Sequence, residues 1–294
     1  MSKRSKACEI SQKVKEIVWN RDNHKCIYCH NEGQQAINNI QLTYDKFVEI
    51  MNYLRLSDFQ EIRFSGGEPL CNIDTIRMIE WVNEHTEWEV GLATNASLIT
   101  EELAERLGKT RVMLTVHLPG IANEEYFNVT KVNDQKDFFN NINFLDKYKV
   151  NYSFNFVLYP EVIDNLSKIL KYVVSKGGRI KLLPFLDNKF SNYSEKSMET
   201  VKKLLEKEQA EYFFDEQKGI IWWYFSNGAT VKLIESPCYT SKFLHCKEYG
   251  EVRLLPDVSL QTCIFGESHK ITNTAEILSV FQMLWNNFNS CIGR

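Results

Sequence analysis

The sequence predicts an α/β fold in which a parallel sheet is built from six strand–helix units. Apolar, β-branched runs recur along the first two thirds of the chain, stretches with helical spacing separate them, and the alternation is strict. Six right-handed units can curl into an open, partial barrel or form a flat doubly wound sheet, and the pattern alone leaves both open. The expected strands are 14–19, 61–65, 89–94, 112–118, 153–159 and 179–185.

Capping residues and apolar faces indicate the helices between these strands. Thr43 and Thr100 each stand where an N-cap is expected, and Gly177-Gly178 stands where a helix should end. The helix after Thr43 carries its apolar face on Phe47, Ile50, Met51 and Leu54.

The alternation stops near residue 210. Two β runs flank Asn227-Gly228, which predicts a hairpin, and residues 251–265 predict a second hairpin. Residues 194–217 are expected to form a solvated amphipathic helix, and 274–288 a closing one. We therefore expect two regions, a barrel over 1–210 and a β-rich C-terminal extension over 211–294.

Composition excludes several classes of protein. The net charge of −3 argues against a nucleic-acid or anionic-membrane partner, and no apolar run approaches the roughly 20 residues of a membrane span. The basic N-terminus lacks the apolar segment of a secretory signal. Eight cysteines without such a signal favour a reducing, cytoplasmic setting and metal or redox chemistry over disulfides.

Two motifs follow directly after expected strands. Cys26 and Cys29 form a C-x-x-C pair in the loop after the first strand, and Gly66-Gly67 with Glu68 ends the second in RFSGGEPL. Ligands bind at the carboxyl ends of parallel strands, so both motifs are in the right place for a site. A zinc knuckle or a thioredoxin-like redox pair would explain the cysteines alone, but neither explains the glycines and Glu68.

In order along the chain, CIYCHNEG, FSGGEPL, LATNASLI, RVMLTVHLPG, NFVLYPEVIDN and KGGRIKLLPF resemble the radical S-adenosylmethionine (SAM) superfamily, in the branch that contains the GTP 3',8-cyclase of molybdenum-cofactor biosynthesis. The resemblance covers roughly 14–187 and favours a partial (β/α)6, TIM-like barrel. It implies an enzyme with a [4Fe–4S] cluster that cleaves SAM reductively to a 5'-deoxyadenosyl radical, which abstracts hydrogen from a substrate. It also implies a cellular reductant of the flavodoxin or ferredoxin type.

The resemblance also implies a set of SAM-binding residues, while no catalytic residue is assigned. Gly66, Gly67 and Glu68 would hold the SAM ammonium, and Tyr28 would lie close to the adenine. The pocket would be completed by Thr94, Asn95, Thr115 and Asn155.

Asp22 stands where the family's C-x3-C-x2-C loop has its first cysteine. It could ligate iron beside Cys26 and Cys29, which we favour because carboxylates are established ligands of first-row metals. Alternatively, the site is degenerate or engineered and the protein a non-catalytic one, or Cys8 supplies the third ligand. The neighbouring His24 and His30 are expected not to bind the metal.

The C-terminal cysteines suggest a second, auxiliary cluster. They flank a predicted hairpin and end in a C-x-F-G segment, as in the cyclase branch and in the shortened "twitch" form of the auxiliary domain. Their spacing is longer than in the cyclase, and buried thiols are the alternative. The candidate ligands are Cys238, Cys246, Cys263 and Cys291, while Cys8 and Cys71 are interpreted as structural.

The sequence gives less direct evidence for the substrate than for the cofactors. Where the cyclase family has arginines for GTP phosphates, this chain has Lys247 and Arg253 among acidic residues, and it lacks the family's terminal Gly-Gly. We therefore expect a small nucleoside-like or peptide substrate, with GTP as the alternative. Lys181 could reach a substrate anion, depending on which face of the sheet it occupies.

Overall fold

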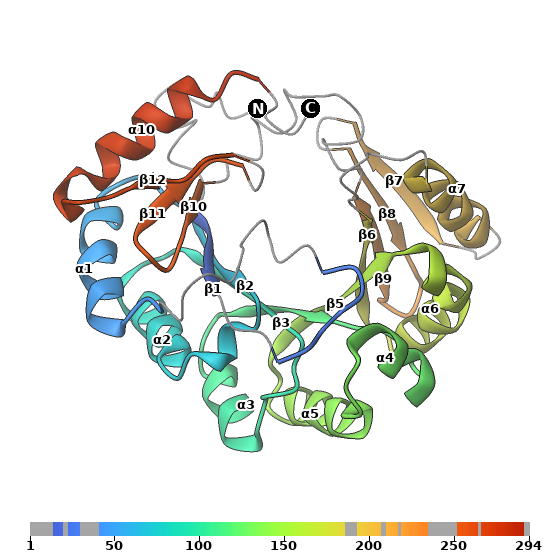
Figure 1. Ribbon diagram of the computed structural model, residues 1–294. Helices are drawn as coiled ribbons and strands as arrows, with labels where there is room; N and C mark the ends of the chain where they lie inside the picture. The colour runs from blue at the N-terminus through green and yellow to red at the C-terminus, as the bar shows by residue number, and fades with distance from the viewer. Residues whose placement is uncertain are drawn as a thin grey trace.

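The computed structural model describes residues 14–19, 23–29, 41–185, 193–206, 210–216, 219–234, 252–263 and 266–290, with only the backbone described at 14–19, 160–162 and 193–197. The strands among these residues form one curved sheet of twelve strands, in the order β12-β11-β10-β1-β2-β3-β4-β5-β6-β9-β8-β7. Figure 1 looks into the open barrel that this sheet forms, with helices around its outer face.

The centre of the sheet is the predicted run of six parallel strands, each hydrogen-bonded to the next along the chain. Each strand begins and ends within two residues of its predicted bounds. They are β1 (Val14–Trp19), β2 (Glu61–Gly66), β3 (Glu89–Thr94), β4 (Met113–His117), β5 (Asn151–Leu158) and β6 (Arg179–Pro184).

Helices cover the outer face of these strands and bury their apolar sides against it (Figure 1). Phe47 of α1, for example, packs on Phe64 of β2 and Trp81 of α2, with both ring-centroid distances at 6.0 Å. No helix of the described residues is long and apolar enough to cross a membrane. The helices are α1 (Tyr44–Leu54), α2 (Thr75–His85), α3 (Glu101–Gly108), α4 (Asn123–Thr130), α5 (Gln135–Lys147) and α6 (Leu166–Ser175), with short 3₁₀ turns η3 (Pro69–Cys71) and η4 (Pro160–Asn165).

Three predicted helix ends are confirmed by the contacts or backbone conformation of their capping residues. Thr43 Oγ1 accepts a hydrogen bond from the Lys46 amide at the start of α1. At the start of α3, Thr100 Oγ1 accepts one from the Leu103 amide. After α6, Gly177 has φ 65° and the Gly178 amide donates to the Val173 carbonyl at 3.0 Å. That left-handed conformation ends the helix at little cost only for glycine.

The C-terminal strands extend the same sheet at both of its edges. β7 (Glu211–Asp215), β8 (Ile220–Tyr224) and β9 (Thr230–Ile234) join beside β6, and β10 (Val252–Leu254), β11 (Ser259–Gln261) and β12 (His269–Lys270) join beside β1. Both predicted hairpins are confirmed, as β8–β9 around Asn227-Gly228 and as β10–β11. The division of the chain at residue 210 stays a prediction.

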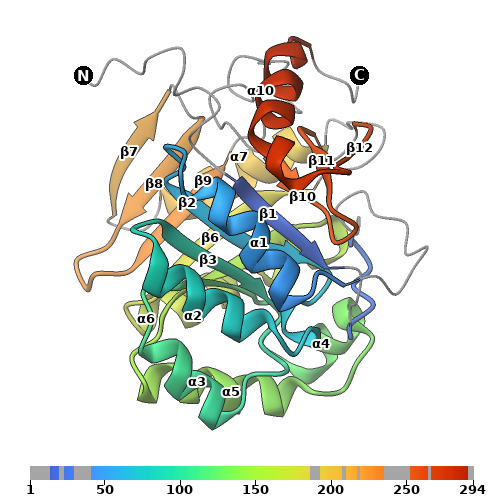
Figure 2. The ribbon, with the colours of Figure 1, turned by 90° about the vertical axis from the view of Figure 1, so that its left-hand side faces the viewer.

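The last helix packs on the outside of the barrel near one edge of the sheet. α10 (Ile277–Asn287) follows the turn η5 (Thr274–Glu276) and packs beside α1, close to β11 and β12 (Figure 2). The Lys46 ammonium of α1 donates to the Thr274 hydroxyl at 2.6 Å. Segments more than 200 residues apart in the sequence are therefore in contact here.

One predicted helix is wrong in its second half. The segment expected as a single helix over 194–217 is α7 (Tyr193–Leu205) followed by strand β7. Aromatic residues favour strands, and here Tyr212, Phe213 and Phe214 pair antiparallel with β8. The tertiary partner therefore decides the conformation of the aromatic run.

Candidate functional site

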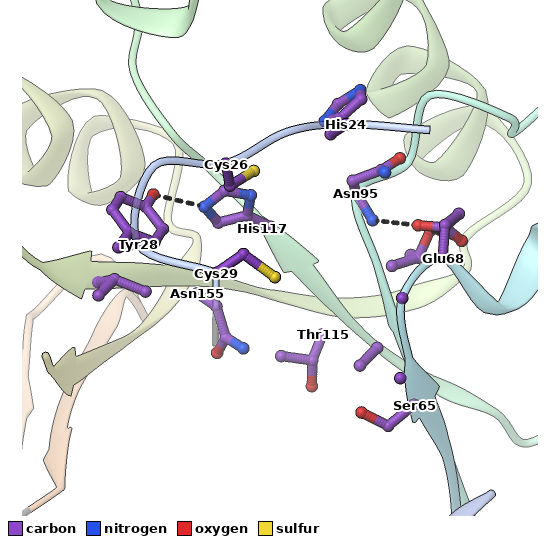
Figure 3. A pocket seen from close by; sticks show the side chains of 15 residues that line it. His24, Cys26, Tyr28, Cys29, Ser65, Glu68, Asn95, Thr115, His117 and Asn155 are labelled. Atoms are coloured by element: carbon purple, nitrogen blue, oxygen red, sulfur yellow. Dashed lines mark hydrogen bonds between the residues drawn. The ribbon is translucent and has the colours of Figure 1, made fainter. Parts of the chain in front are cut away.

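A cavity of about 210 Å³ opens at the carboxyl ends of β2 to β5, where the sequence placed the site. Its wall combines the 23–29 loop with residues from the ends of these four strands (Figure 3). The eight predicted SAM-binding residues all line it, together with both cysteines of the C-x-x-C pair. The full wall is His24, Cys26, Tyr28, Cys29, Ser65, Gly66, Gly67, Glu68, Ala93, Thr94, Asn95, Thr115, His117, Asn155 and Val157.

The loop that carries the cysteines is attached to the end of α4. The amides of Lys25 and Ile27 donate to the carbonyls of Thr130 and Val129, at 2.9 and 3.1 Å. The Cys29 amide then donates to the Cys26 carbonyl at 3.0 Å, which turns the chain so that both thiols face the cavity. Cys29 is exposed and Cys26 half-buried, and both line the cavity.

Glu68 ties the end of β2 to the end of β3. Its side chain is buried, with 1% of the residue exposed. One carboxylate oxygen accepts from the Thr94 hydroxyl at 2.9 Å and the Leu70 amide at 3.0 Å, and the other accepts from the Asn95 amide at 2.7 Å. Three hydrogen bonds to one buried carboxylate fix the two strand ends relative to each other.

Asn95 connects β3 to the cysteine loop. Its side-chain amide donates to Asn23 Oδ1 at 2.7 Å, and its own Oδ1 accepts from the Ser97 hydroxyl at 2.7 Å. Asn23 closes the ring by donating to Ser97 Oγ at 2.6 Å. The loop position is therefore set by side chains that directly follow β3 as well as by the backbone of α4.

His117 is a wall residue that the sequence analysis missed. Its Nε2 lies 2.7 Å from the Tyr28 hydroxyl, and the two rings meet edge to face at 5.7 Å (Figure 3). Burial, and to a lesser extent the nearby His24, lower the pKa of His117 to about 4, so its imidazole is neutral at pH 7 and can accept the tyrosine proton. The signal was present in the sequence, since His117 lies two residues after Thr115 on the same strand face.

Tyr28 and His24 are held in the site by their own contacts. Burial, followed by the charges of Cys26 and Cys29, raises the pKa of Tyr28 well above its usual value, so the phenol stays protonated. His24 is buried and its Nε2 lies 3.1 Å from Asp134 Oδ2. This pairing occupies one ring nitrogen, and the expectation that His24 does not bind the metal stays a prediction.

Gly66 and Asn155 supply features that suit a bound cofactor. Gly66 has φ 126°, a conformation that other residues rarely adopt, and it lets a ligand approach the strand end closely. The side-chain oxygen of Asn155 is buried and, among the described residues, accepts no hydrogen bond. Because a buried acceptor without a partner costs free energy, a polar ligand in this cavity would stabilise it. The donor set therefore fits SAM beside a cluster held in part by two cysteines.

Several predicted metal ligands lie outside the described residues, so their positions stay predictions. Cys263 is described, half-buried just after β11, and Cys71 is half-buried at the end of η3. Within the described ranges, no three of the His, Cys, Asp and Glu side chains are grouped as metal ligands would be. The predicted ligands outside those ranges are Asp22, Cys238, Cys246 and Cys291. Cys8, the alternative third ligand, and His30, which is expected not to bind the metal, also lie outside them.

Comparison with known proteins identifies the family of this chain. The family model described as "Radical SAM superfamily" matches residues 18–173, more than half of the chain. A protein of Methanocaldococcus jannaschii named "Probable GTP 3',8-cyclase" is 26% identical over 288 residues, covering 94% of this chain and 92% of its own. A protein of the same name from Methanococcus aeolicus is 25% identical, covering 85% and 84%.

Solved structures show the same fold. The crystal structure of Streptococcus suis SuiB bound to precursor peptide SuiA matches with a TM-score of 0.71 at 13% identity, over 96% of this chain and 67% of that one. A structure titled "Native anSMEcpe with bound AdoMet" matches with a TM-score of 0.56 at 17% identity, over 66% and 59%. The chain thus spans about two thirds or less of these proteins. From the family match and the relatives, the chain belongs to the radical SAM superfamily, as an enzyme of the branch that includes proteins named GTP 3',8-cyclase.

Proposed function

We propose that this enzyme binds SAM in the cavity at the ends of β2 to β5, beside a [4Fe–4S] cluster. The cluster, when bound, supplies the electron that cleaves SAM reductively. The resulting radical would take hydrogen from a small nucleoside-like or peptide substrate. The observation that carries the proposal is the convergence of Cys26 and Cys29 with all eight predicted SAM-binding residues on one cavity.

Each part of the wall has a role in this proposal. Cys26 and Cys29 would hold iron, with Asp22 as the third ligand. Glu68 would carry the negative charge that the SAM ammonium needs, while Gly66 leaves room for the ligand against the backbone. The buried Tyr28 would cover one side and exclude water, and Asn155 Oδ1 would accept from a polar group of the ligand.

One measurement tests the central claim. The purified chain is reconstituted anaerobically with iron and sulfide, reduced strongly in the presence of SAM, and assayed for 5'-deoxyadenosine. We expect 5'-deoxyadenosine in proportion to the cluster content. Iron incorporation without any 5'-deoxyadenosine would refute the proposal and favour a protein that has lost the reaction.

Asp22 can be tested as a ligand in the same preparation. A carboxylate is a weaker electron donor than a thiolate, so Asp22→Cys should increase the iron retained after gel filtration and Asp22→Ala should decrease it. Equal iron content and SAM turnover in Asp22→Ala and the parent would show that the aspartate is not a ligand.

GTP cyclisation is the second candidate, favoured by the names of the relatives. Against it, Arg253 of β10 is 1% exposed, so this arginine is not on a surface that a triphosphate can reach. Incubating the reconstituted enzyme with GTP and SAM decides between them. Formation of a cyclised GTP product would make the second candidate the correct one.

We also propose that the C-terminal region, 211–294, binds an auxiliary cluster through Cys263 with Cys238, Cys246 and Cys291. A cluster there would add iron beyond the first site. The iron content of the reconstituted Cys263→Ala variant should therefore fall by about one cluster, while the Cys71→Ala control should match the parent. Unchanged iron in Cys263→Ala would exclude this cysteine as a ligand.

A further inference from the structure

The ring of Tyr28 is held by a hydrogen bond at one end and by ring contacts along its side. Its hydroxyl lies 2.7 Å from His117 Nε2, and the two rings meet edge to face with centroids 5.7 Å apart (Figure 3). The Tyr28 ring also contacts Tyr159, at 5.5 Å between centroids and 53° between ring planes. Tyr159 is in turn held by Phe185, with these two rings edge to face at 4.8 Å. Together, these contacts define where the Tyr28 ring lies on the cavity wall.

The residues that hold this ring come from the ends of three neighbouring strands. His117 is the last residue of β4, and Tyr159 and Phe185 directly follow β5 and β6. The three strands are paired in register with one another. Residues carried by paired strands are positioned more precisely than residues carried by a loop, so the strand ends give the ring a fixed support.

The Tyr28 contact also fixes the second half of the cysteine loop. The first half is held through Asn23, which is hydrogen-bonded to side chains that follow β3. Tyr28 lies between Cys26 and Cys29, so its hydrogen bond ties the second half of the loop to β4. The loop is thus attached to two neighbouring strand ends, on either side of Cys26.

His117 lies on the strand face that carries a predicted SAM-binding residue. It is two residues from Thr115, and both residues line the cavity. Burial lowers the pKa of His117 to about 4, so the imidazole is neutral at pH 7 and its Nε2 can accept a hydrogen bond from the phenol. The contact therefore fixes the Tyr28 ring without adding a charge to the cavity.

We propose that His117 is a positioning residue for SAM binding and that it acts through Tyr28. This inference rests on the proposed function, in which Tyr28 covers one side of the bound SAM, and it gives a role to a residue outside the predicted SAM-binding set. The hydrogen bond restricts the Tyr28 ring in the folded protein. SAM binding then does not have to restrict it, and the affinity for SAM increases.

The test is a double-mutant cycle on the affinity for SAM. Tyr28→Phe removes the hydroxyl, His117→Met removes the acceptor, and a third variant carries both changes. His117→Gln is the conservative replacement, because its side-chain oxygen can accept the same hydrogen bond. Each protein is reconstituted anaerobically and left unreduced so that SAM is not cleaved, and isothermal calorimetry with SAM measures the dissociation constant.

Two control variants remove the same chemical groups elsewhere. Tyr53→Phe changes a half-buried tyrosine of α1, and His269→Met changes an exposed histidine of β12. The iron content of each preparation gives the cluster-loaded fraction, to which the dissociation constant is referred. Circular dichroism verifies that each variant is folded.

We expect Tyr28→Phe and His117→Met each to weaken SAM binding about fivefold, the effect of one ordinary hydrogen bond. The double variant should bind no more weakly than either single variant, and His117→Gln should recover most of the affinity. Both controls should bind SAM as the parent does.

Three results would overturn the inference. Parent-like affinity in His117→Met would show that the contact serves only the fold. A double variant that binds about 25-fold more weakly than the parent would show that His117 acts independently of Tyr28. Absence of SAM binding by the parent would remove the basis of the inference. A coupled loss of affinity without any 5'-deoxyadenosine after reduction would support the positioning role and count against the proposed function alone.

Discussion

Replacing Glu68 by glutamine tests whether the buried carboxylate holds the two strand ends together. Glutamine has the same shape, so the change leaves packing intact and alters only charge and donor–acceptor pattern. In the parent, both carboxylate oxygens accept hydrogen bonds, from the Leu70 amide and Thr94 hydroxyl on one and the Asn95 amide on the other. An amide group has one oxygen and one NH₂, and it cannot accept on both sides.

The cost follows from these contacts. Whichever way the glutamine amide is turned, its NH₂ faces a backbone N–H, of Leu70 or of Asn95, and leaves it without an acceptor. An unsatisfied buried donor costs about 1–3 kcal/mol, and the remaining hydrogen bonds weaken as the acceptor becomes neutral. The gain from no longer burying a charge offsets part of this loss. We expect Glu68→Gln to lower the free energy of unfolding by about 2 kcal/mol.

Urea unfolding of the metal-free chain, followed by circular dichroism, measures this loss. Glu84→Gln is the matched control, because Glu84 is exposed on α2 and its replacement should change stability by less than about 0.5 kcal/mol. If Glu68→Gln unfolds at the same urea concentration as Glu84→Gln, the hydrogen bonds of the Glu68 carboxylate do not stabilise the ends of β2 and β3. Binding of SAM to the reconstituted variant should weaken as well, since the neutral side chain no longer attracts the ammonium.

Three other predictions use the same unfolding measurement. The folded-state pKa of His117 is depressed to about 4, so the unfolded chain takes up the proton first as pH falls below 6.5. Lowering the pH to 5 should therefore destabilise the parent about 2 kcal/mol more than His117→Asn, and equal losses would contradict the shifted pKa. Val258 has φ 61° in the β10–β11 turn, so Val258→Gly should stabilise by about 1 kcal/mol, whereas unchanged or lower stability would argue against backbone strain. A Cβ on Gly120 would lie 2.6 Å from the Glu125 Cβ, so Gly120→Ala should destabilise by about 2 kcal/mol or more, and a parent-like midpoint would show that the α4 backbone can move.

The sequence predicted the local features of the fold well. The periodicity of apolar residues located the six central strands, and Thr43, Thr100 and the Gly177-Gly178 pair marked helix ends where the structure has them. These signals depend on residues close together in the chain, so the sequence carries them directly. Residues 211–215 were missed because an aromatic run next to a helix becomes a strand only when β8 is available to pair with it.

Part of the site was likewise predictable from the sequence, and part was not. The position of Cys26, Cys29 and Gly66-Gly67 after expected strands was sufficient to predict that they meet, because parallel strands bring their carboxyl ends to one edge. The Tyr28–His117 contact was not predictable. It joins a loop to a strand residue 89 positions away in the sequence, and it depends on how the loop is placed over the ends of the strands.

The sequence by itself determined the superfamily, the parallel α/β core and the edge of the sheet where the site lies, because short motifs and local periodicity are written in consecutive residues. Only the tertiary structure decided that β9 pairs with β6 and β10 with β1, and hence that Lys181 and Lys232 project to the same face of the sheet. Strand order and register arise from contacts between distant segments. A shift of one residue in register would turn either lysine to the opposite face of the sheet.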